Sequence, residues 1–345
     1  MIQDYAAFAA EKACQLLAID SPSGYTKAAA ERVQQEFSAL GFSASFTKKG
    51  GVLIDLGGKD PEDALLIEAH TDTLGAMVAE VKENGRLRIT NLGGIHLENI
   101  EAENIRVHTR SGKVIEGTLQ LINASGHVNS AYGDTKRTFA TTEIVLDEDV
   151  SSAADTRALG IEVGDFVCFE PRTRITGSGY IKSRFLDDKL SVGILLGLAK
   201  YLHDSGKTPQ RKVYLHITVY EEVGHGGSSS VPAGVTEAIC VDMGCVGEGL
   251  TCTERKVSIC AKDSGGPYSY DVVGKLIQAA EKEGADYAVD VYPFYRSDVA
   301  TTLCAGYDLR HGLIGPGVYA SHGYERSHMD GVLNTLKVLK GYLEI

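Results

Sequence analysis

Acidic residues and histidines follow several apolar segments of this chain, at the point where each segment ends. The first group, His70-Thr71-Asp72, follows an apolar run that begins at Ala64. Open α/β sheets place their ligands at the carboxyl ends of strands, so we expect such side chains to lie close together. The later groups are Asp187-Asp188-Lys189, Glu221-Glu222, Asp242 and a late histidine, His322.

Each group also has an ordinary structural explanation. A single histidine at a strand end, such as His70, is most often held by local hydrogen bonds. An aspartate at a helix start, such as Asp187, is usually a cap. The pair Glu221-Glu222 is typical of a solvated loop entry, and Asp242 is typical of a strand that runs out into solvent. Taken one at a time, these explanations are the more common ones.

Taken together, the groups favour metal binding. Hard and borderline divalent ions bind imidazole and carboxylate ligands, and Zn²⁺ accepts both. A dinuclear site needs several such groups, with one carboxylate shared between ions that are roughly 3.5–4 Å apart. In an extended segment, residues 70 and 72 lie on the same side, so Asp72 can orient the imidazole of His70.

Segments with helical and extended patterns alternate around these groups, which predicts a sheet covered by helices. The apolar run Ala64–Ile67 suits a strand buried on both faces of a mixed or parallel sheet. The predicted helices are Tyr5–Leu17, Lys27–Leu40, Lys189–Leu202, Tyr270–Glu283 and Met329–Leu343. The predicted strands are Phe42–Phe46, Gly51–Leu56, Ala64–Ala69, Val213–Tyr220, Ala238–Met243, Val257–Lys262 and Tyr287–Tyr292.

The sequence pattern changes between the α/β elements before residue 73 and those after residue 175. From about Thr73 to Ile175 helical periodicity disappears, and short alternating segments are separated by turn signals such as Asn84-Gly85. A structureless loop of this length would be unusual, so the segment is predicted to be a domain of its own. We therefore predict a mixed-sheet α/β domain (residues 1–72 and 176–345) interrupted by a small β-barrel-like insert (73–175).

Composition narrows the class of protein further. The chain has 345 residues, of which 43% are hydrophobic and 23% charged, as in ordinary folded proteins. The net charge of −12, without a lysine–arginine cluster, argues against nucleic acid as a partner. No apolar run is long enough to span a membrane and the first residues lack a signal-peptide pattern, so we expect a cytoplasmic protein. The seven cysteines include no Cys-x-x-Cys and are expected to be reduced.

Five ordered motifs give the chain a family resemblance: Ala69-His70-Thr71-Asp72, Leu186-Asp187-Asp188-Lys189, Glu221-Glu222-Val223-Gly224, Val241-Asp242-Met243 and Ser321-His322. With them the sequence resembles the tetrahedral or glutamyl aminopeptidases, a family of dinuclear metallopeptidases. The resemblance covers nearly the whole chain. It includes Ser21-Pro22-Ser23-Gly24-Tyr25, residues 159–165 at the end of the insert and Arg296-Ser297-Asp298.

The resemblance implies roles for these residues. One ion is held by His70 and Asp242, the other by Glu222 and His322, and both by the bridging Asp187. Asp72 orients His70, and Glu221 is the general base. The choice of Asp187 over Asp188 as the bridge follows the family pattern and not the spacing. The metal is expected to be Zn²⁺, with Co²⁺ or Mn²⁺ as alternatives.

The sequence departs from the family pattern at two places. Lys189 stands where relatives commonly have arginine, and the residues after His322 differ from those of many relatives, which makes His328 a rival ligand. Two further residues are candidates for substrate contact. Asp298 belongs to the motif Arg296-Ser297-Asp298, which is expected near the bound substrate. His127 of the insert is a candidate to approach the active site of a neighbouring subunit. His225 is expected to have a structural role in a turn.

The function implied by the resemblance is removal of N-terminal residues from short peptides by metal-activated water. The family also implies self-association, with the insert making dimer contacts and often twelve subunits in a hollow tetrahedron. An alternative with the same metal pair is an amidohydrolase of an N-acylated amino acid or a compatible-solute dipeptide. A non-catalytic metal-binding assembly module is disfavoured because Glu221 is present. Glycosidase chemistry could use paired acids, but two histidines with a shared aspartate suit metal better.

Overall fold

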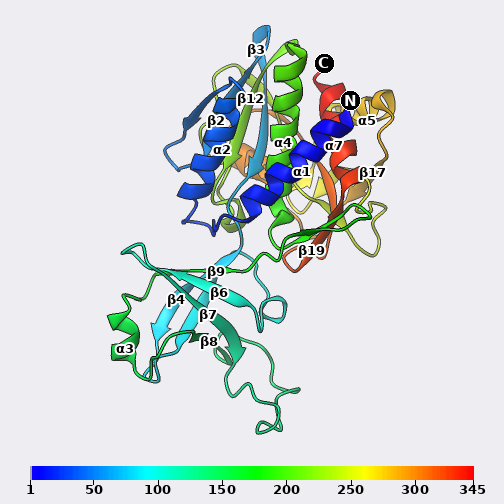
Figure 1. The fold of residues 1–345 in the computed structure, drawn as a ribbon. Coiled ribbons are helices and arrows are strands. Elements are labelled where there is room, and N and C mark those ends of the chain that lie inside the picture. Colours follow the sequence, from blue (N-terminus) through cyan, green and yellow to red (C-terminus); the bar gives the residue numbers. More distant parts are fainter. Residues whose placement is uncertain (1) are drawn as a thin grey trace. The chain divides into compact units, whose positions relative to one another are not determined.

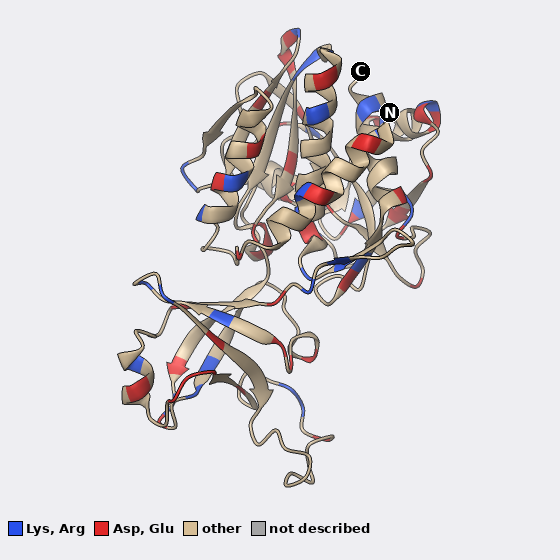
Figure 2. Ribbon diagram, viewed as in Figure 1, with Lys and Arg blue, Asp and Glu red and all other residues tan. Residues whose placement is uncertain are grey.

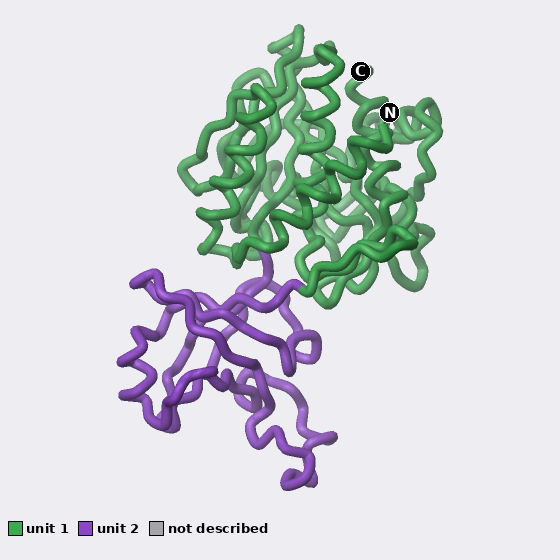
Figure 3. Tube along the Cα trace, in the orientation of Figure 1, with its two compact units in different colours: residues 1–72, 172–345 green, residues 73–171 purple. Residues whose placement is uncertain are grey.

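The computed structural model describes residues 2–345, which form two compact units (Figure 3). The first unit combines the chain up to Asp72 with Arg172–Ile345, and the second is Thr73–Pro171. Together they confirm the predicted fold class, an α/β domain with a mixed sheet and an inserted β-barrel. Within residues 2–345, no helix is both long enough and apolar enough to cross a membrane.

The first unit is organised around a large mixed sheet (Figure 1). Its strands run in the spatial order β1-β2-β12-β3-β13-β18-β19-β11-β10, and β14 to β17 join it at β18 and β15. The central strands β12, β3, β13 and β18 are mutually parallel. The bounds are β1 Ser43–Phe46, β2 Val52–Gly57, β3 Asp60–His70, β10 Arg174–Ile175, β11 Tyr180–Ser183, β12 Arg211–Thr218, β13 Val235–Val241, β14 Gly244–Val246, β15 Val257–Asp263, β16 Gly266–Pro267, β17 Tyr287–Val291, β18 Arg310–Tyr319 and β19 Glu325–His328.

Helices cover this sheet, and the most buried of them is α4. A Cβ atom on Gly193 of α4 would lie 2.5 Å from the carbonyl oxygen of Ala9 in α1, so only glycine permits this close approach. The helix is therefore fixed at the centre of the unit, where its first turn can position functional groups. The bounds are α1 Ile2–Leu17, α2 Lys27–Ala39, α4 Leu186–Ser205, α5 Tyr270–Glu283, α6 Asp298–Cys304 and α7 Met329–Tyr342.

Strand β18 is the main element that the sequence analysis did not predict. Its segment contains Pro316 and three glycines, which are depleted in strands. A Cβ atom on Gly315 would lie 1.3 Å from the carbonyl oxygen of Asp242, so the neighbouring chain excludes any side chain there. The strand lacks the usual sequence signal because it is packed too closely to carry one.

The second unit is a closed barrel with the strand order β4-β5-β8-β7-β6-β9. Buried and exposed positions alternate along β7, which explains the alternating pattern of the sequence. Residues 172–175 do not belong to it, contrary to the predicted end at 175, because β10 pairs with β11 in the other unit. The bounds are β4 Gly75–Val81, β5 Leu87–Leu92, η1 Leu97–Asn99, β6 Asn104–His108, β7 Val114–Leu121, β8 Thr142–Leu146, α3 Ala153–Ala158 and β9 Phe166–Phe169.

Charged residues of both signs are interspersed in each unit, as Figure 2 shows. Glu143 of the barrel, for example, is buried between Lys82 and Arg86. The formal net charge of −12 therefore does not arise from one acidic segment. Part of it is concentrated at the site described next.

Candidate active site

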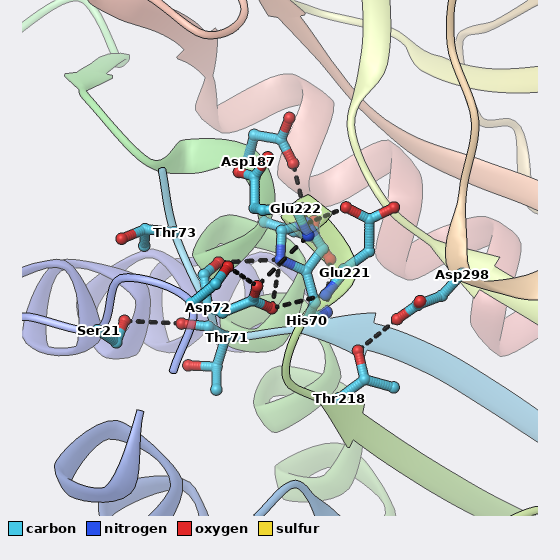
Figure 4. Close-up of polar contacts among 12 residues, drawn as sticks. Ser21, His70, Thr71, Asp72, Thr73, Asp187, Thr218, Glu221, Glu222 and Asp298 are labelled. Atoms are coloured by element: carbon cyan, nitrogen blue, oxygen red, sulfur yellow. Dashed lines mark hydrogen bonds and ion pairs between the residues drawn. The ribbon is translucent and has the colours of Figure 1, made fainter. Parts of the chain in front are cut away.

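The acidic groups meet because their strands are parallel neighbours. Strand β3 ends at His70, which pairs with Thr218 at the end of β12. Strand β13 lies on the other side of β3 and ends directly before Asp242. The first turn of α4 adds Asp187 (Figure 4). The carboxyl ends of parallel strands form one edge of a sheet, and the side chains that follow them share it.

His70 is 1% exposed, and each of its ring nitrogens has a hydrogen-bond partner. Its Nδ1 donates a hydrogen bond to the backbone carbonyl of Asp72 (2.9 Å), and its Nε2 lies 3.1 Å from Oδ1 of Asp187. Burial lowers the pKa of His70, but the hydrogen bonds with Asp187 and Asp72 outweigh it and hold the pKa well above the usual value. The bond at Nδ1 orients the ring so that Nε2 faces the acidic cluster.

Asp187 lies between two imidazoles. Its Oδ1 contacts Nε2 of His70, and its Oδ2 lies 3.6 Å from Nε2 of His322. Burial alone would raise the pKa of Asp187, but the hydrogen bond with His70 overrides it and the pKa is lowered. One carboxylate thus faces two separate histidines, one oxygen to each.

Glu221 and Glu222 form a single turn, η2 (Glu221–Val223), and not the end of a strand. Strand β12 stops at Thr218, and Tyr220 has a left-handed backbone (φ 73°) that breaks the extended geometry. Oε2 of Glu221 lies 3.8 Å from Nε2 of His70, whereas Oε2 of Glu222 lies 3.7 Å from Nε2 of His322. The adjacent carboxylates therefore face different histidines.

Asp242 completes the cluster from β13. It is 2% exposed, and its Oδ1 accepts the N–H of Met243. Burial, followed by the charge of Asp187, raises the pKa of Asp242 to about 7. Potential ligand atoms lie within 4.8 Å of one another in two groups, His70–Asp187–Glu222 and His70–Asp188–Asp242.

The electrostatics of this cluster fit divalent cations. Burial raises the pKa values of Glu221 and Glu222 well above the usual range, and the charge of Asp187 raises both further. Oε1 of Glu222 is buried and has no hydrogen-bond partner among residues 2–345. Buried anionic oxygens are costly unless a cation or a donor compensates them. Imidazole and carboxylate donors are those that Zn²⁺, Co²⁺ and Mn²⁺ accept, so the residues present suit a pair of such ions.

The carboxylate of Asp72 has partners in addition to His70, which it was predicted to orient. It lies 3.5 Å from Nδ1 of His70, which is bonded to the backbone carbonyl of Asp72 instead. Its oxygens accept the N–H groups of Glu221 (3.1 Å) and Glu222 (3.3 Å) (Figure 4). They also accept the hydroxyl of Ser23. Asp72 therefore orients His70 through its main chain and holds turn η2 through its side chain.

Asp188 and Lys189 support the cluster from within the protein. Oδ2 of Asp188 accepts the backbone N–H of His70 at 3.1 Å. Lys189 is 1% exposed and donates to the carbonyls of Leu16 (3.0 Å) and Ile19 (2.6 Å). Each acceptor is a single carbonyl oxygen, so the compact ammonium group of a lysine can bond to it without the planar fork of an arginine.

The structure separates the two rival histidines. His322 faces Asp187 and Glu222, as described above. His328 caps α7, because its Nδ1 accepts the N–H of Asp330 (3.0 Å), and its Nε2 lies 2.8 Å from the carbonyl oxygen of Ser178. Both ring nitrogens of His328 are thus occupied away from the cluster, and His322 remains the predicted ligand.

The structure gives the surroundings of the two candidates for substrate contact and of the turn histidine. Asp298 is 1% exposed and accepts the N–H of Gly227 and the hydroxyl of Thr218. Burial, and next the charge of a neighbouring glutamate, raises its pKa to about 6. His127 is exposed in the barrel unit. His225 stacks on Tyr220 with ring centroids 4.9 Å apart, which agrees with a role in the turn.

Glu325 is another buried carboxylate beside the cluster, and it was not among the predicted site residues. Its oxygens accept the backbone N–H groups of His322 (3.0 Å) and Asp187 (3.1 Å). Burial, and next the charge of Asp187, raises the pKa of Glu325 well above its usual range. The residue stands in a short segment without periodicity, and no sequence signal pointed to it.

The cluster opens into a cavity of about 250 Å³ in the α/β unit. Its lining includes four carboxylates of the cluster and His322. The other lining residues are Gly224, Met243, Phe294, Tyr295, Arg296 and Thr301. Asp298 is not among the residues that line the cavity.

Comparison with known proteins identifies the class of protein to which this fold and site belong. A family model described as M42 glutamyl aminopeptidase matches residues 50–338, which include every group of the cluster. The chain belongs to this family and is an aminopeptidase, a hydrolase of peptide bonds. The putative aminopeptidase YhfE of Bacillus subtilis (strain 168) is 42% identical over 330 residues, 96% of this chain and 95% of that protein.

Solved structures show the same fold. The aminopeptidase APDkam598 from the archaeon Desulfurococcus kamchatkensis has a TM-score of 0.87 and 21% identity, and the match covers 99% of this chain and 95% of that one. The Pyrococcus horikoshii TET1 peptidase, which can assemble into a tetrahedron or a large octahedral shell, has a TM-score of 0.85 and 21% identity. That match covers 96% of this chain and 98% of the TET1 chain.

Proposed function

We propose that the chain removes N-terminal residues from short peptides with two divalent ions held by His70, Asp187, Glu222, Asp242 and His322. The observation that carries this proposal is the position of Asp187, whose two oxygens face the two histidines separately. A carboxylate shared between ions needs this arrangement. The buried Oε1 of Glu222 without a hydrogen-bond partner among the described residues supports the same ligand set.

The chemistry divides between the ions and the chain. Bound divalent ions supply Lewis-acid polarisation of the scissile carbonyl and a lowered pKa for water. Glu221 takes the proton of the attacking water and passes it to the leaving amine. Its carboxylate lines the cavity, and burial raises its pKa above the usual value for glutamate. Asp72 holds the N–H of Glu221 and so keeps this base in place.

Removal of metal is the direct test of this proposal. Exhaustive chelation and dialysis should abolish hydrolysis of aminoacyl anilides, because every proposed ligand is a histidine or a carboxylate. Zn²⁺, Co²⁺ or Mn²⁺ should restore the activity, and elemental analysis of the active protein should find about two ions per chain. Full activity in a chelated protein that contains no metal would refute the proposal.

A panel of aminoacyl anilides and dipeptides distinguishes an aminopeptidase from the alternative deacylase. Each anilide or dipeptide is assayed with a free N-terminal amine and with an N-acetyl group. An aminopeptidase cleaves the free form and leaves the acetylated one intact. Preference for the acetylated substrates would support an amidohydrolase with the same metal cluster.

We also propose that the chain self-associates and that the barrel unit contributes to the assembly. The resemblance to the TET1 peptidase, which itself assembles into shells, supports this proposal. Replacing Thr73–Pro171 with a short Gly-Ser linker should leave a folded α/β unit of smaller oligomeric mass, since that unit has its own sheet and core. Light scattering measures the mass, and circular dichroism checks the fold. An unchanged number of subunits in a folded variant would contradict the assembly role.

A further inference from the structure

Glu325 connects two segments that carry candidate metal ligands. It is the first residue of β19 and is 2% exposed. Oε1 accepts the backbone N–H of His322, and Oε2 accepts the backbone N–H of Asp187. These two residues are 135 positions apart in the chain (322 − 187), and one side chain fixes the backbone of both.

The backbone at His322 needs such a support. His322 and Ala320 both have left-handed backbones, with φ values of 60° and 58°. This conformation is unfavourable for residues with a side chain and persists only where the surroundings hold it. The N–H of Gly323 closes the turn on the carbonyl of Ala320 (3.0 Å), and Glu325 holds the N–H of His322 between them.

The backbone at Asp187 needs support for a related reason. Asp187 lies at the start of α4 but has a ψ of 100°, which is outside helical geometry. N–H groups in the first turn of a helix have no acceptor within the helix. Oε2 of Glu325 supplies that acceptor, so it helps to set the direction in which the Asp187 carboxylate points.

We propose that Glu325 is a positioning residue that sets the separation of Asp187 and His322, and thereby the affinity for the ion held by His322 and Glu222. This inference rests on the proposed function. Oδ2 of Asp187 and Nε2 of His322 are 3.6 Å apart, close enough for a small movement of either backbone to change a shared metal geometry. Glu325 is bonded to two ligands of this ion, Asp187 and His322, but only to the shared Asp187 among the ligands of the other ion, so the other ion should be affected less.

The test compares Glu325→Gln with Glu237→Gln. The first variant keeps the shape of the side chain but leaves one of the two N–H groups facing an amide NH₂. Glu237 is a matched control, because it is fully buried at the other end of β13 and is bonded to Arg211, Arg310 and Tyr342. Metal-free protein is titrated with Co²⁺, and the two binding steps are followed by calorimetry and by the visible spectrum.

Glu325→Gln should weaken Co²⁺ binding at the site of His322 and Glu222, taken as the second binding step, by about 10- to 100-fold. The spectrum of that step should also change. Both are the usual effects of losing a group that orients a ligand. The first step should stay near that of the wild type, and excess metal should restore turnover. Glu237→Gln should lower the melting temperature while both binding steps stay unchanged. A merely structural role for Glu325 predicts the behaviour of Glu237→Gln for both variants.

Two outcomes overturn the inference in different ways. Wild-type affinities for both ions in folded Glu325→Gln would remove the positioning role and leave the proposed function intact. A wild-type protein that binds fewer than two ions would refute the proposed function itself. Glu325→Asp is the second variant if the glutamine variant does not fold. Its shorter side chain keeps the charge but cannot reach both N–H groups, so the same loss at the second step is expected.

Discussion

Glu221→Gln is expected to lower turnover by about 10²- to 10⁴-fold, the usual worth of a positioned general base. The amide keeps the shape of the side chain but cannot take a proton from water. Metal content should stay at the wild-type level, because Glu221 is not among the proposed ligands. The measurements are kcat on an aminoacyl anilide and elemental analysis of the same sample.

Glu222→Gln is the matched control, since it makes the same chemical change in the next residue. The Glu222 carboxylate faces His322, so its loss should weaken the binding of one ion and reduce activity through that loss. Added metal should therefore rescue Glu222→Gln in part and should not rescue Glu221→Gln. Equal loss of metal in both variants, or an active Glu221→Gln, would show that the base is another residue.

Asp187→Asn is expected to reduce metal binding more than Glu222→Gln does, because it replaces the carboxylate proposed to bind both ions. Ligand binding stabilises a protein by about 2.7 kcal/mol for each site at a ligand concentration of 100 Kd. The wild type should therefore gain thermal stability when metal is added, and Asp187→Asn should lose most of this gain together with activity. Differential scanning calorimetry with and without Zn²⁺ measures the difference.

Asp188→Asn distinguishes the two neighbouring aspartates. Asp188 also belongs to a group of potential ligands with His70 and Asp242, but its Oδ2 is bonded to the backbone N–H of His70. We expect this variant to keep its metal-dependent stabilisation. If Asp188→Asn loses the stabilisation and Asp187→Asn retains it, Asp188 is the bridging ligand.

Elements with a periodic apolar pattern could be predicted from the sequence. Helix α5 spans Tyr270–Glu283, the same residues that the helical spacing predicts. Strand β3 was indicated by the continuous apolar run before His70. Strand β18 was not, because its glycines allow close approach of Asp242 and Thr253 and carry no hydrophobic pattern. Periodicity reports the burial of side chains, and it therefore misses a strand whose packing depends on their absence.

The site shows a similar division. Residue type and position at the ends of elements indicated the groups that could bind metal, and the family resemblance supplied the particular ligands. The structure brings these ligands, His70, Asp187, Glu222, Asp242 and His322, together. The hydrogen bonds that hold these residues in place could not be predicted from the sequence. Asp72 reaches the backbone of η2, and Glu325 reaches the backbone of two distant segments. A hydrogen bond to a main-chain N–H leaves no pattern in the sequence, because every residue except proline offers that donor.

The connectivity of the two units has a consequence for the order of folding. Strand β3 pairs with β12 and β13, and β13 pairs with β18, so the strand that ends at His70 finds its neighbours only after the barrel segment has been synthesised. All strands of the barrel lie within Thr73–Pro171 and depend on shorter loop closures. During synthesis the barrel can therefore fold first. Strand β3 is apolar and stays unpaired until its neighbouring strands are made, so it needs protection from aggregation during that time. The catalytic centre is completed last, when the segment with His322 has joined the sheet.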